Sequence, residues 1–278
     1  MEANKEKMTS YECNEYEQII KWQNEEPSVV SQTINVVLKP VSLLISKIVP
    51  PKAIQGALTA FDGLADLLTD SNDIKRDGGV DNIEELRRKD LQLSDKLANS
   101  VHNWANGVAG AEGAVTGATG LLGLIVDIPS LITMSLRVIH KIGLCYGYDC
   151  ISLTDKQFVF SILSAAGSSS VKEKAASIAM LQAINKTILT VTWKKMAEKA
   201  TANKIGKESL ILSIRQLAKQ LNVNLTKRKA LQSIPVIGAS VGAALNIAFI
   251  NDVAWAARRA YQERWLLENG KIMDNGQK

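Results

Sequence analysis

The sequence predicts an all-α protein, a single helical domain built around two Gly-rich helical hairpins. Aromatic residues make up only 5% of the 278 residues, whereas small and aliphatic residues fill long stretches. This composition favours closely packed helices over an aromatic-rich β-sandwich. Apolar residues also recur at helical spacing through most of the chain. In two segments small residues recur every three or four positions, which leaves one helix face almost bare for a close neighbour.

The first part of the chain is predicted to form helices separated by turn signals. Pro27 and the Pro50-Pro51 pair mark breaks, Pro40 begins a new helix or kinks the existing one, and Gly78-Gly79 marks a loop. The spacing of apolar residues predicts helices over 11–23, 28–48, 53–68 and 83–104, and a loop over 70–82.

Two later segments are almost free of charge. Residues 107–123 contain six glycines, residues 113–136 carry Asp127 as their one charge, and residues 230–251 carry none. Twenty-two residues could span a bilayer. However, an Asp near a helix centre costs roughly 2.5 to 3.5 kcal/mol on insertion. We therefore expect buried core hairpins, with reversible membrane insertion and permanent spans as the alternatives.

Two groups of short motifs lie in and beside these segments. The central motifs are Gly110-Ala111-Glu112-Gly113-Ala114, Thr116-Gly117-Ala118-Thr119-Gly120-Leu121-Leu122-Gly123, Asp127-Ile128-Pro129, Leu136-Arg137, Ile139-His140-Lys141-Ile142 and Tyr146-Gly147-Tyr148-Asp149. The C-terminal motifs are Leu225-Thr226-Lys227-Arg228-Lys229, Ile234-Pro235-Val236-Ile237-Gly238-Ala239, Gly242-Ala243-Ala244-Leu245-Asn246 and Phe249-Ile250-Asn251-Asp252-Val253. These motifs resemble the signatures of the EcsC family, and the resemblance covers about residue 11 to residue 267. We expect a disordered N-terminus (1–10), one domain (11–267) and a flexible tail (268–278).

The resemblance implies a cellular location and a genetic context for the protein, but no enzymatic reaction. The family takes its name from a bacterial locus that also encodes an ATP-binding cassette transporter, and its members are regarded as cytoplasmic or membrane-associated. A link to a transporter or to secretion is therefore an expectation for this chain.

The charged residues within or beside the apolar segments are the candidates for chemistry. They are Glu112, Asp127, Arg137, His140 and Asp252. A carboxylate among apolar residues needs a partner. We therefore expect Asp127 to be buried with Arg137, His140 or a backbone donor as its partner. Arg258 follows Asp252 along the chain in the same way that Arg137 and His140 follow Asp127. The set forms either a buried polar network that fixes the register of the hairpins or an acid–base site.

Metal and cofactor chemistry have little support in the sequence. The chain has two histidines, three cysteines and no Gly-Lys-Ser/Thr phosphate loop, so we expect no metal and no cofactor. The odd number of cysteines indicates a reducing compartment. The polar, acidic N-terminus does not resemble a secretory signal. We expect a cytoplasmic protein that is also a candidate for peripheral membrane attachment.

A basic stretch suggests the partner. Residues 172–229 hold 13 basic and three acidic residues, a balance that attracts anions. The candidate membrane contacts are Trp193, Lys194, Lys195, Lys199, Lys204 and Lys207, on a helix that suits an anionic headgroup zone. The alternative is a solvated helix face. We expect an anionic membrane surface or a membrane protein as partner. We expect no nucleic acid, because recognition motifs are missing and aromatics are few.

The sequence thus predicts a non-enzymatic, membrane-associated accessory protein. Two alternatives stay open: a hydrolase-type enzyme that uses Asp127, Arg137 and His140, and an effector that inserts its hairpins conditionally into a membrane.

Overall fold

The computed structural model confirms the all-α prediction. It describes residues 2–27, 51–64, 70–118, 123–194, 202–229 and 238–273. The α-helices of these ranges are α1 (Ser10–Asn24), α4 (Pro51–Leu64), α5 (Asn72–Gly78), α6 (Leu91–Ala118), α7 (Gly123–Cys145), α8 (Leu153–Ala166), α9 (Val171–Lys194), α10 (Ala202–Lys229) and α11 (Gly238–Glu268). Two short 3-10 helices, η1 (Lys5–Lys7) and η2 (Ile83–Arg88), and two strands, β1 (Glu2–Ala3) and β2 (Ile272–Met273), complete them.

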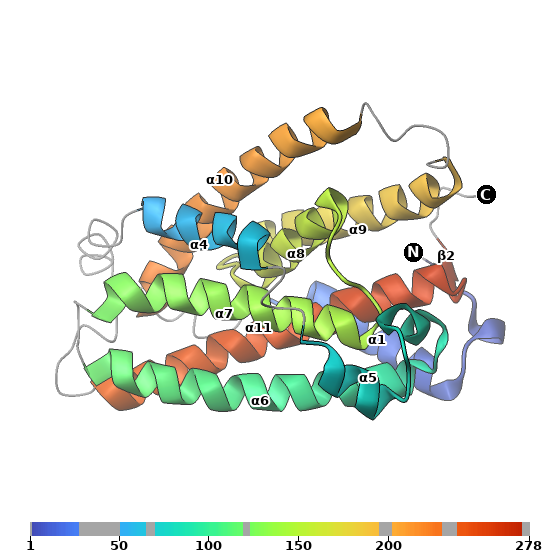
Figure 1. Cartoon of the computed structure of the whole chain (residues 1–278), viewed down its shortest axis with the longest axis horizontal. Coiled ribbons are helices and arrows are strands. Elements are labelled where there is room, and N and C mark those ends of the chain that lie inside the picture. The colour runs from blue at the N-terminus through green and yellow to red at the C-terminus, as the bar shows by residue number, and fades with distance from the viewer. Residues whose placement is uncertain are drawn as a thin grey trace.

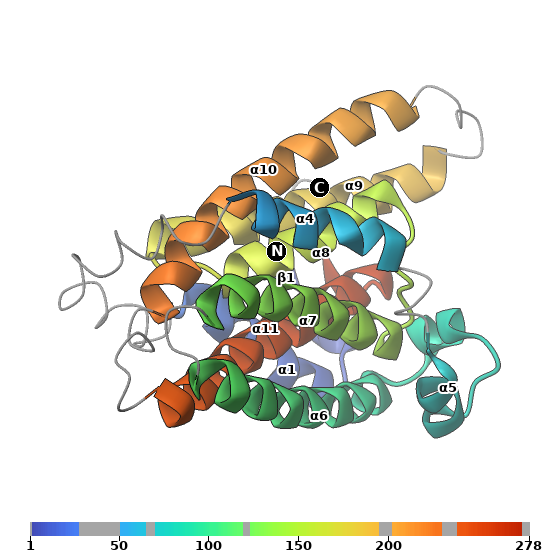
Figure 2. The ribbon, with the colours of Figure 1, turned by 60° about the vertical axis from the view of Figure 1, so that its left-hand side comes forward.

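The helices form two packed groups. Helices α1, α6 and α7 surround α11, while α8 packs against α9 and α10, and α10 against α4 (Figure 1). Contacts of α4 with α7 and of α8 with α11 join the groups (Figure 2). Because α11 has neighbours on every side, apolar and polar residues alike are buried around its circumference.

The sequence predicts that Gly113, Gly117 and Gly120 face another helix at short distance, and this contact is observed at Gly113. Gly120 and the surroundings of Gly117 lie outside what the structure describes. Helices α6 and α11 share the most extensive contact in the fold, and Ala105, Ala109 and Gly113, each four residues apart, are buried on α6. A Cβ atom at Gly113 would lie 2.6 Å from the carbonyl oxygen of Gly242 and 2.8 Å from the Cα of Ala243. Whether the segments form hairpins remains a prediction, because residues 119–122 and 230–237 lie outside the described ranges.

The end of α7 explains the Tyr146–Asp149 motif. Gly147 adopts φ +89°, and a Cβ there would lie 2.6 Å from Cγ of Arg87, so both the backbone conformation and the close approach require glycine. On either side of it, Tyr146 and Tyr148 stack on Tyr261 of α11, with ring centroids 6.1 and 5.6 Å apart. The motif therefore joins α7 to η2 and to α11.

Two sequence-based boundaries differ from the structure. The expected loop over 70–82 contains α5, and the expected helix over 83–104 is divided into η2 and the start of α6. The division falls at Asp90, whose Oδ1 accepts a hydrogen bond from the backbone N–H of Gln92 at 2.9 Å. Such a side chain satisfies an N–H group left open at a helix start. A helix therefore begins at Leu91 and does not continue from Ile83.

The described parts of the two chain ends pair with each other. Strands β1 and β2 pair antiparallel, and the backbone N–H of Asn4 donates to the Lys271 oxygen at 2.9 Å. Ile272 is 2% exposed. The described parts of both ends are thus held together by backbone hydrogen bonds and by apolar burial. The domain limits of 11 and 267 remain a prediction.

Replacing Gly113 by alanine is expected to lower the free energy of unfolding by about 1 to 3 kcal/mol, because the new methyl group overlaps the backbone of α11. Gly107→Ala is the matched control in the same helix, since nothing lies within 4 Å of a Cβ there. The free energy of unfolding of the control variant is expected to exceed that of the parent protein by up to about 1 kcal/mol, because alanine favours a helix more than glycine does. Urea unfolding measures both. Equal stability of the two variants would contradict the close contact.

Candidate functional site

The candidate site forms around two basic residues at the end of α10. Arg228 and Lys229 close this helix, where cations interact favourably with the helix dipole. Successive residues of an α-helix point in directions about 100° apart. The two side chains therefore reach different neighbours, and each meets a carboxylate.

Lys229 lies in a closed polar triangle between three helices. Its Nζ donates to Oδ2 of Asp127 on α7 and to Oδ1 of Asn246 on α11, and Nδ2 of Asn246 donates to Oδ1 of Asp127 at 3.1 Å. All three residues are at most 2% exposed. Burial lowers the pKa of Lys229, and the charge of Asp127 opposes that shift. We call these three residues the buried triad.

Arg228 forms the second ion pair. One of its terminal N–H groups donates to Oδ2 of Asp252 at 2.9 Å, and the guanidinium lies 5.3 Å from the ring centroid of Phe249. The Arg228 side chain is 6% exposed, and that of Asp252 is 27% exposed. Unlike the buried triad, this pair faces a cavity.

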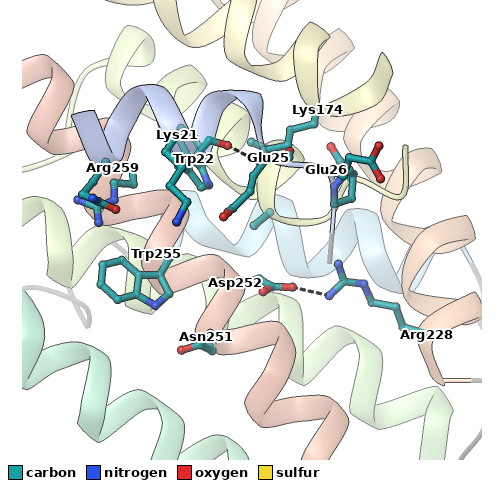
Figure 3. A pocket seen from close by; sticks show the side chains of 15 residues that line it. Lys21, Trp22, Glu25, Glu26, Lys174, Arg228, Asn251, Asp252, Trp255 and Arg259 are labelled. Carbon is teal, nitrogen blue, oxygen red and sulfur yellow. Dashed lines mark hydrogen bonds and ion pairs between the residues drawn. The ribbon is translucent and has the colours of Figure 1, made fainter. Parts of the chain in front are cut away.

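The cavity measures about 430 Å³ and lies between the end of α1 and one face of α11 (Figure 3). Lys21 and Trp22 of α1 and Glu25, which follows this helix, line it opposite Asp252 and Trp255 of α11. Its other lining residues include Gln18, Glu26, Pro27, Ala165, Ala166, Ser168, Lys174, Arg228, Asn251 and Arg259. The walls carry both charge signs and two indole rings, so the cavity suits a polar ligand.

Helix α1 is held over the cavity by polar contacts. Nζ of Lys174 donates to the carbonyl oxygens of Trp22 and Glu25, at 2.5 and 2.7 Å, and lies 5.3 Å from the Trp22 ring centroid. Farther along, a terminal nitrogen of Arg259 pairs with Oε2 of Glu15 at 2.6 Å. The Lys174 contacts satisfy two backbone carbonyl groups at the C-terminal end of α1.

Asp127 is buried as expected, but the expected ion-pair partner was wrong. Helix α7 runs unbroken from Gly123 to Cys145 through Pro129. At 1.5 Å per residue, Arg137 lies about 15 Å and His140 about 20 Å along the axis from Asp127. Arg137 is exposed, with its guanidinium 5.3 Å from the Trp104 ring centroid. The three residues therefore do not assemble into one acid–base cluster.

The other predicted residues take separate positions. His140 is buried, which lowers its pKa to about 4 with Asp149 opposing the shift. Glu112 is exposed on α6. Asp252 pairs with Arg228, whereas Arg258 donates to Oδ1 of Asn99 at 3.1 Å. Asp252 is thus the predicted residue that reaches the cavity.

The predicted membrane contacts fall largely outside the described part of the chain. Lys195 and Lys199 lie outside the described residues, as do the side chains of Trp193, Lys194, Lys204 and Lys207. Elsewhere in the basic stretch, Lys172, Lys186, Arg215 and Lys219 are exposed. Lys174, Arg228 and Lys229 are buried. The net charge of the stretch therefore overstates its basic surface.

The sequence reasoning missed the side chains that make the site. Arg228, Lys229 and Asn246 stood in motifs of the family resemblance, and Arg228 and Lys229 were otherwise counted only among the basic residues of 172–229. A signal was present, because Asn246 interrupts an uncharged segment and a polar group there needs a partner. Among the described residues, no group of three or more His, Cys, Asp or Glu side chains could hold a metal ion.

A second polar cluster holds the opposite half of α11. Asp95 of α6 accepts hydrogen bonds from Tyr11, Tyr146 and Gln262, and burial raises its pKa. One residue farther along α11, Glu263 is 3% exposed and lies beside Gln23 of α1 and Gln182 of α9. Burial raises the pKa of Glu263 to about 7, while hydrogen bonds from the two amides oppose that shift.

Fold and site together define a helical domain that carries charged pairs inside its bundle and a polar cavity at its side. The sequence model of the EcsC protein family matches residues 14–266. The chain belongs to this family. The match includes the buried triad and the lining residues of the cavity.

One curated relative is similar over a shorter range. The "Uncharacterized protein YdbA" of Bacillus subtilis (strain 168) is 26% identical over 191 residues, which is 69% of this chain. The similarity spans 65% of that protein's length. No solved structure matches the chain.

Removing the carboxylate of the buried triad is expected to destabilise the fold. Asp127→Ala leaves the ammonium of Lys229 buried without its anion, which typically costs about 3 to 5 kcal/mol. Glu112→Ala removes an exposed carboxylate of α6 and is expected to change stability by less than about 0.5 kcal/mol. Thermal and urea unfolding compare the two. An Asp127→Ala variant as stable as the control would show that the triad does not hold the helices together.

Glu263 is expected to make stability depend on pH. Its pKa of about 7 in the folded protein lies above the ordinary 4.5. Between these values the folded state keeps a proton that the unfolded state releases, so the free energy of unfolding falls as pH rises, by about 3 kcal/mol in all. The lowered pKa of His140 contributes the opposite slope between about pH 4 and 6.5, so the parent curve alone is not diagnostic.

Comparison with a variant isolates the Glu263 contribution. Relative to the parent protein, Glu263→Gln is expected to gain about 3 kcal/mol of stability between pH 4.5 and pH 8, measured by urea unfolding at each pH. Glu17→Gln, at an exposed position of α1, is the control and should show no such gain. A stability difference between Glu263→Gln and the parent that stays constant with pH would contradict the raised pKa.

Proposed function

We propose that the protein is a non-enzymatic accessory protein that attaches to the cytoplasmic face of a membrane through one end of its helical bundle. The surface in question is where α6 ends and α7 and α11 begin, and we call it the uncharged end. The observation that carries the proposal is that the described parts of two segments that are almost free of charge and far apart in the sequence, 113–136 and 230–251, meet there.

The contacts of Gly113 support this arrangement. Its Cα lies against Gly242 and Ala243 of α11, and the three helix termini point to the same end of the molecule (Figure 1). Val126 is 63% exposed and Ile247 is 39% exposed there. Asp127 is withdrawn into the buried triad, which leaves Glu112 as an exposed carboxylate of the described part of this end. Such a surface suits the apolar–polar boundary of a bilayer.

Peripheral contact accords better with helix burial than a span does. In the described part of the chain, α7 is the helix that is long and apolar enough to cross a membrane, over Val126–Cys145 with a mean hydropathy of 1.2. However, 72% of this stretch is buried against other helices. A core helix satisfies the same length and composition criteria, so we propose surface attachment without a span.

The basic stretch offers a competing attachment surface. In Figure 1 the C-terminal end of α9 lies near the opposite end of the long axis from the uncharged end, and the N-terminal end of α10 lies between them at the top of the view. A flat bilayer that contacts the uncharged end does not reach the C-terminal end of α9. Electrostatic docking through the basic residues is therefore a separate alternative, and its binding would weaken as salt screens the charges.

Two features support a non-enzymatic role. The buried triad is closed to solvent, so no substrate reaches Asp127 or Lys229. The acid–base cluster of Asp127, Arg137 and His140 is not assembled. A membrane-protein partner, such as the transporter that the family resemblance suggests, is the second occupant that we propose for the uncharged end.

Vesicle flotation tests the attachment surface. With phosphatidylethanolamine and phosphatidylglycerol vesicles, the protein is expected to float, and the Val126→Glu, Ile247→Glu double variant to lose most of that binding, because two carboxylates oppose apolar contact. Ile211→Glu, Leu212→Glu is the matched control, since these α10 side chains are 49% and 57% exposed. Binding should persist at 1 M salt.

Two results would contradict the uncharged end as the attachment surface. One is flotation that disappears at high salt while both double variants still bind at low salt. The other is equal loss of binding in the test and control variants, which would indicate non-specific apolar adhesion.

A further inference from the structure

A groove of about 260 Å³ lies between α9 and α10 and has α8 as its floor. Both walls pack on α8 (Figure 1), and over their described lengths they make few contacts with each other. Phe160 and Ser161 of α8 are buried at the bottom, whereas Met180 of α9 and Gln216 of α10 are exposed along the rims. Each helix lines the groove over about two turns, which is about 10 Å. The lining stretches are 157–164, 173–180 and 213–220.

Hydrogen bonds between neutral side chains hold the walls of the groove to its floor. Oγ of Ser164 on α8 donates to Oε1 of Gln220 on α10 at 2.7 Å and lies 2.8 Å from Oγ of Ser177 on α9. In return, Nε2 of Gln220 donates to the carbonyl oxygen of Ser164 at 3.0 Å. These contacts fix the positions of all three helices, so the groove is formed before any partner arrives.

The free charges beside the groove are basic. Lys172 of α9 and Lys219 of α10 are exposed next to lining residues of the two walls. Neither lysine makes an ion pair with the described part of the chain. Glu173 is the acidic residue among the lining residues, and its Oε2 already accepts from the backbone N–H of Ser169 and from Nδ2 of Asn224, at 2.8 and 2.9 Å. An acidic partner therefore meets an unpaired cation on each wall.

Apolar groups along the rims indicate a partner that covers them. Met180 is 54% exposed, and Val223, less than one turn beyond the lining part of α10, is 44% exposed. Ala176 and Ala183 add small exposed residues on the α9 side. A flat bilayer would rest on these rims and leave the floor in water. A helix instead packs between two neighbouring helices, because its ridges of side chains enter the space between theirs.

We propose that the groove between α9 and α10 binds an amphipathic helix of a partner protein, with the apolar face of that helix toward α8 and its acidic side chains beside Lys172 and Lys219. Apolar anchors in a groove with charged rims are a recurring mode of helix recognition. The lining residues belong to α8, α9 and α10, whereas the uncharged end is built from α6, α7 and α11. The groove therefore adds a protein-binding surface that does not depend on membrane attachment.

Fluorescence anisotropy of the full chain with two designed peptides tests the groove. Both peptides form helices of about five turns with alanine and leucine along one face. One carries glutamate on both sides of that face, and the other carries lysine at the same positions. The glutamate peptide is expected to bind saturably and at least about tenfold more tightly than the lysine peptide. No saturable binding of the glutamate peptide, or equal binding of both peptides, would overturn the proposal.

Two neighbouring alanines provide matched variants that locate the binding. Ala175 and Ala176 are both exposed on α9, but Ala176 lines the groove and Ala175 does not. Ala176→Tyr fills the groove and is expected to raise the Kd of the glutamate peptide at least about tenfold. Ala175→Tyr should leave this Kd unchanged. Both substitutions are at the surface, so the fold should be retained, with circular dichroism as the check. An equal Kd for the two variants would overturn the groove as the site.

Charge reversal tests the basic rims. Lys172→Glu and Lys219→Glu are each expected to raise the Kd of the glutamate peptide about tenfold and to lower that of the lysine peptide. Lys96→Glu reverses an exposed charge of α6 outside the groove and should change neither value. Unchanged affinities in the Lys172 and Lys219 variants would overturn the acidic character of the partner.

Two further measurements exclude other occupants. Flotation with phosphatidylglycerol vesicles that Lys172→Glu and Lys219→Glu abolish and Ala176→Tyr does not, without binding of the glutamate peptide, would assign the rims to a lipid surface and overturn the proposal. Light scattering that finds a dimer, and a monomer in Ala176→Tyr, would assign the groove to a second copy of the chain and overturn the acidic partner. Loss of all flotation with peptide binding intact would refute the membrane role and support the groove.

Discussion

The buried ammonium of Lys229 is the constraint on which the site depends. A charge removed from water must be paired and hydrogen-bonded, and here Asp127 of α7 and Asn246 of α11 meet that need together. The end of α10 is therefore held against two helices at once. Because Arg228 is the neighbouring residue, the same placement brings its guanidinium to Asp252 at the cavity. The closed triad and the open cavity therefore both depend on the position of the last residues of α10.

Helix α11 extends this principle along its length. Its buried polar side chains meet partners on different helices, so each contact sets the position of another element. The partners are Glu15 of α1 for Arg259, Asp95 of α6 for Gln262, Asp155 of α8 for Arg264 and Gln23 of α1 for Glu263. A shift of α11 by one residue would bury these groups without partners. We infer that the polar contacts specify the register of the bundle, while apolar burial supplies most of its stability.

The uncharged end of the bundle combines small residues with few charged groups. The contact of Gly113 with the α11 backbone leaves no room for side chains, so this end of the bundle is built from glycine, alanine and a few aliphatic groups. Such a surface has few charged groups that would have to leave water on contact with the apolar part of a membrane.

The sequence alone predicts the helical class, the tight contact at Gly113 and the burial of Asp127. Each depends on local spacing: apolar periodicity, small residues every three or four positions, and one charge in an apolar run. The partner of Asp127 could not be found in this way, because Lys229 lies 102 residues away and reaches it only after α10 packs on α7. Arg137 was the nearer choice in sequence, yet a continuous helix carries it about 15 Å away. The cavity likewise forms where α1, α10 and α11 meet, so only the tertiary structure decides which charges face one another.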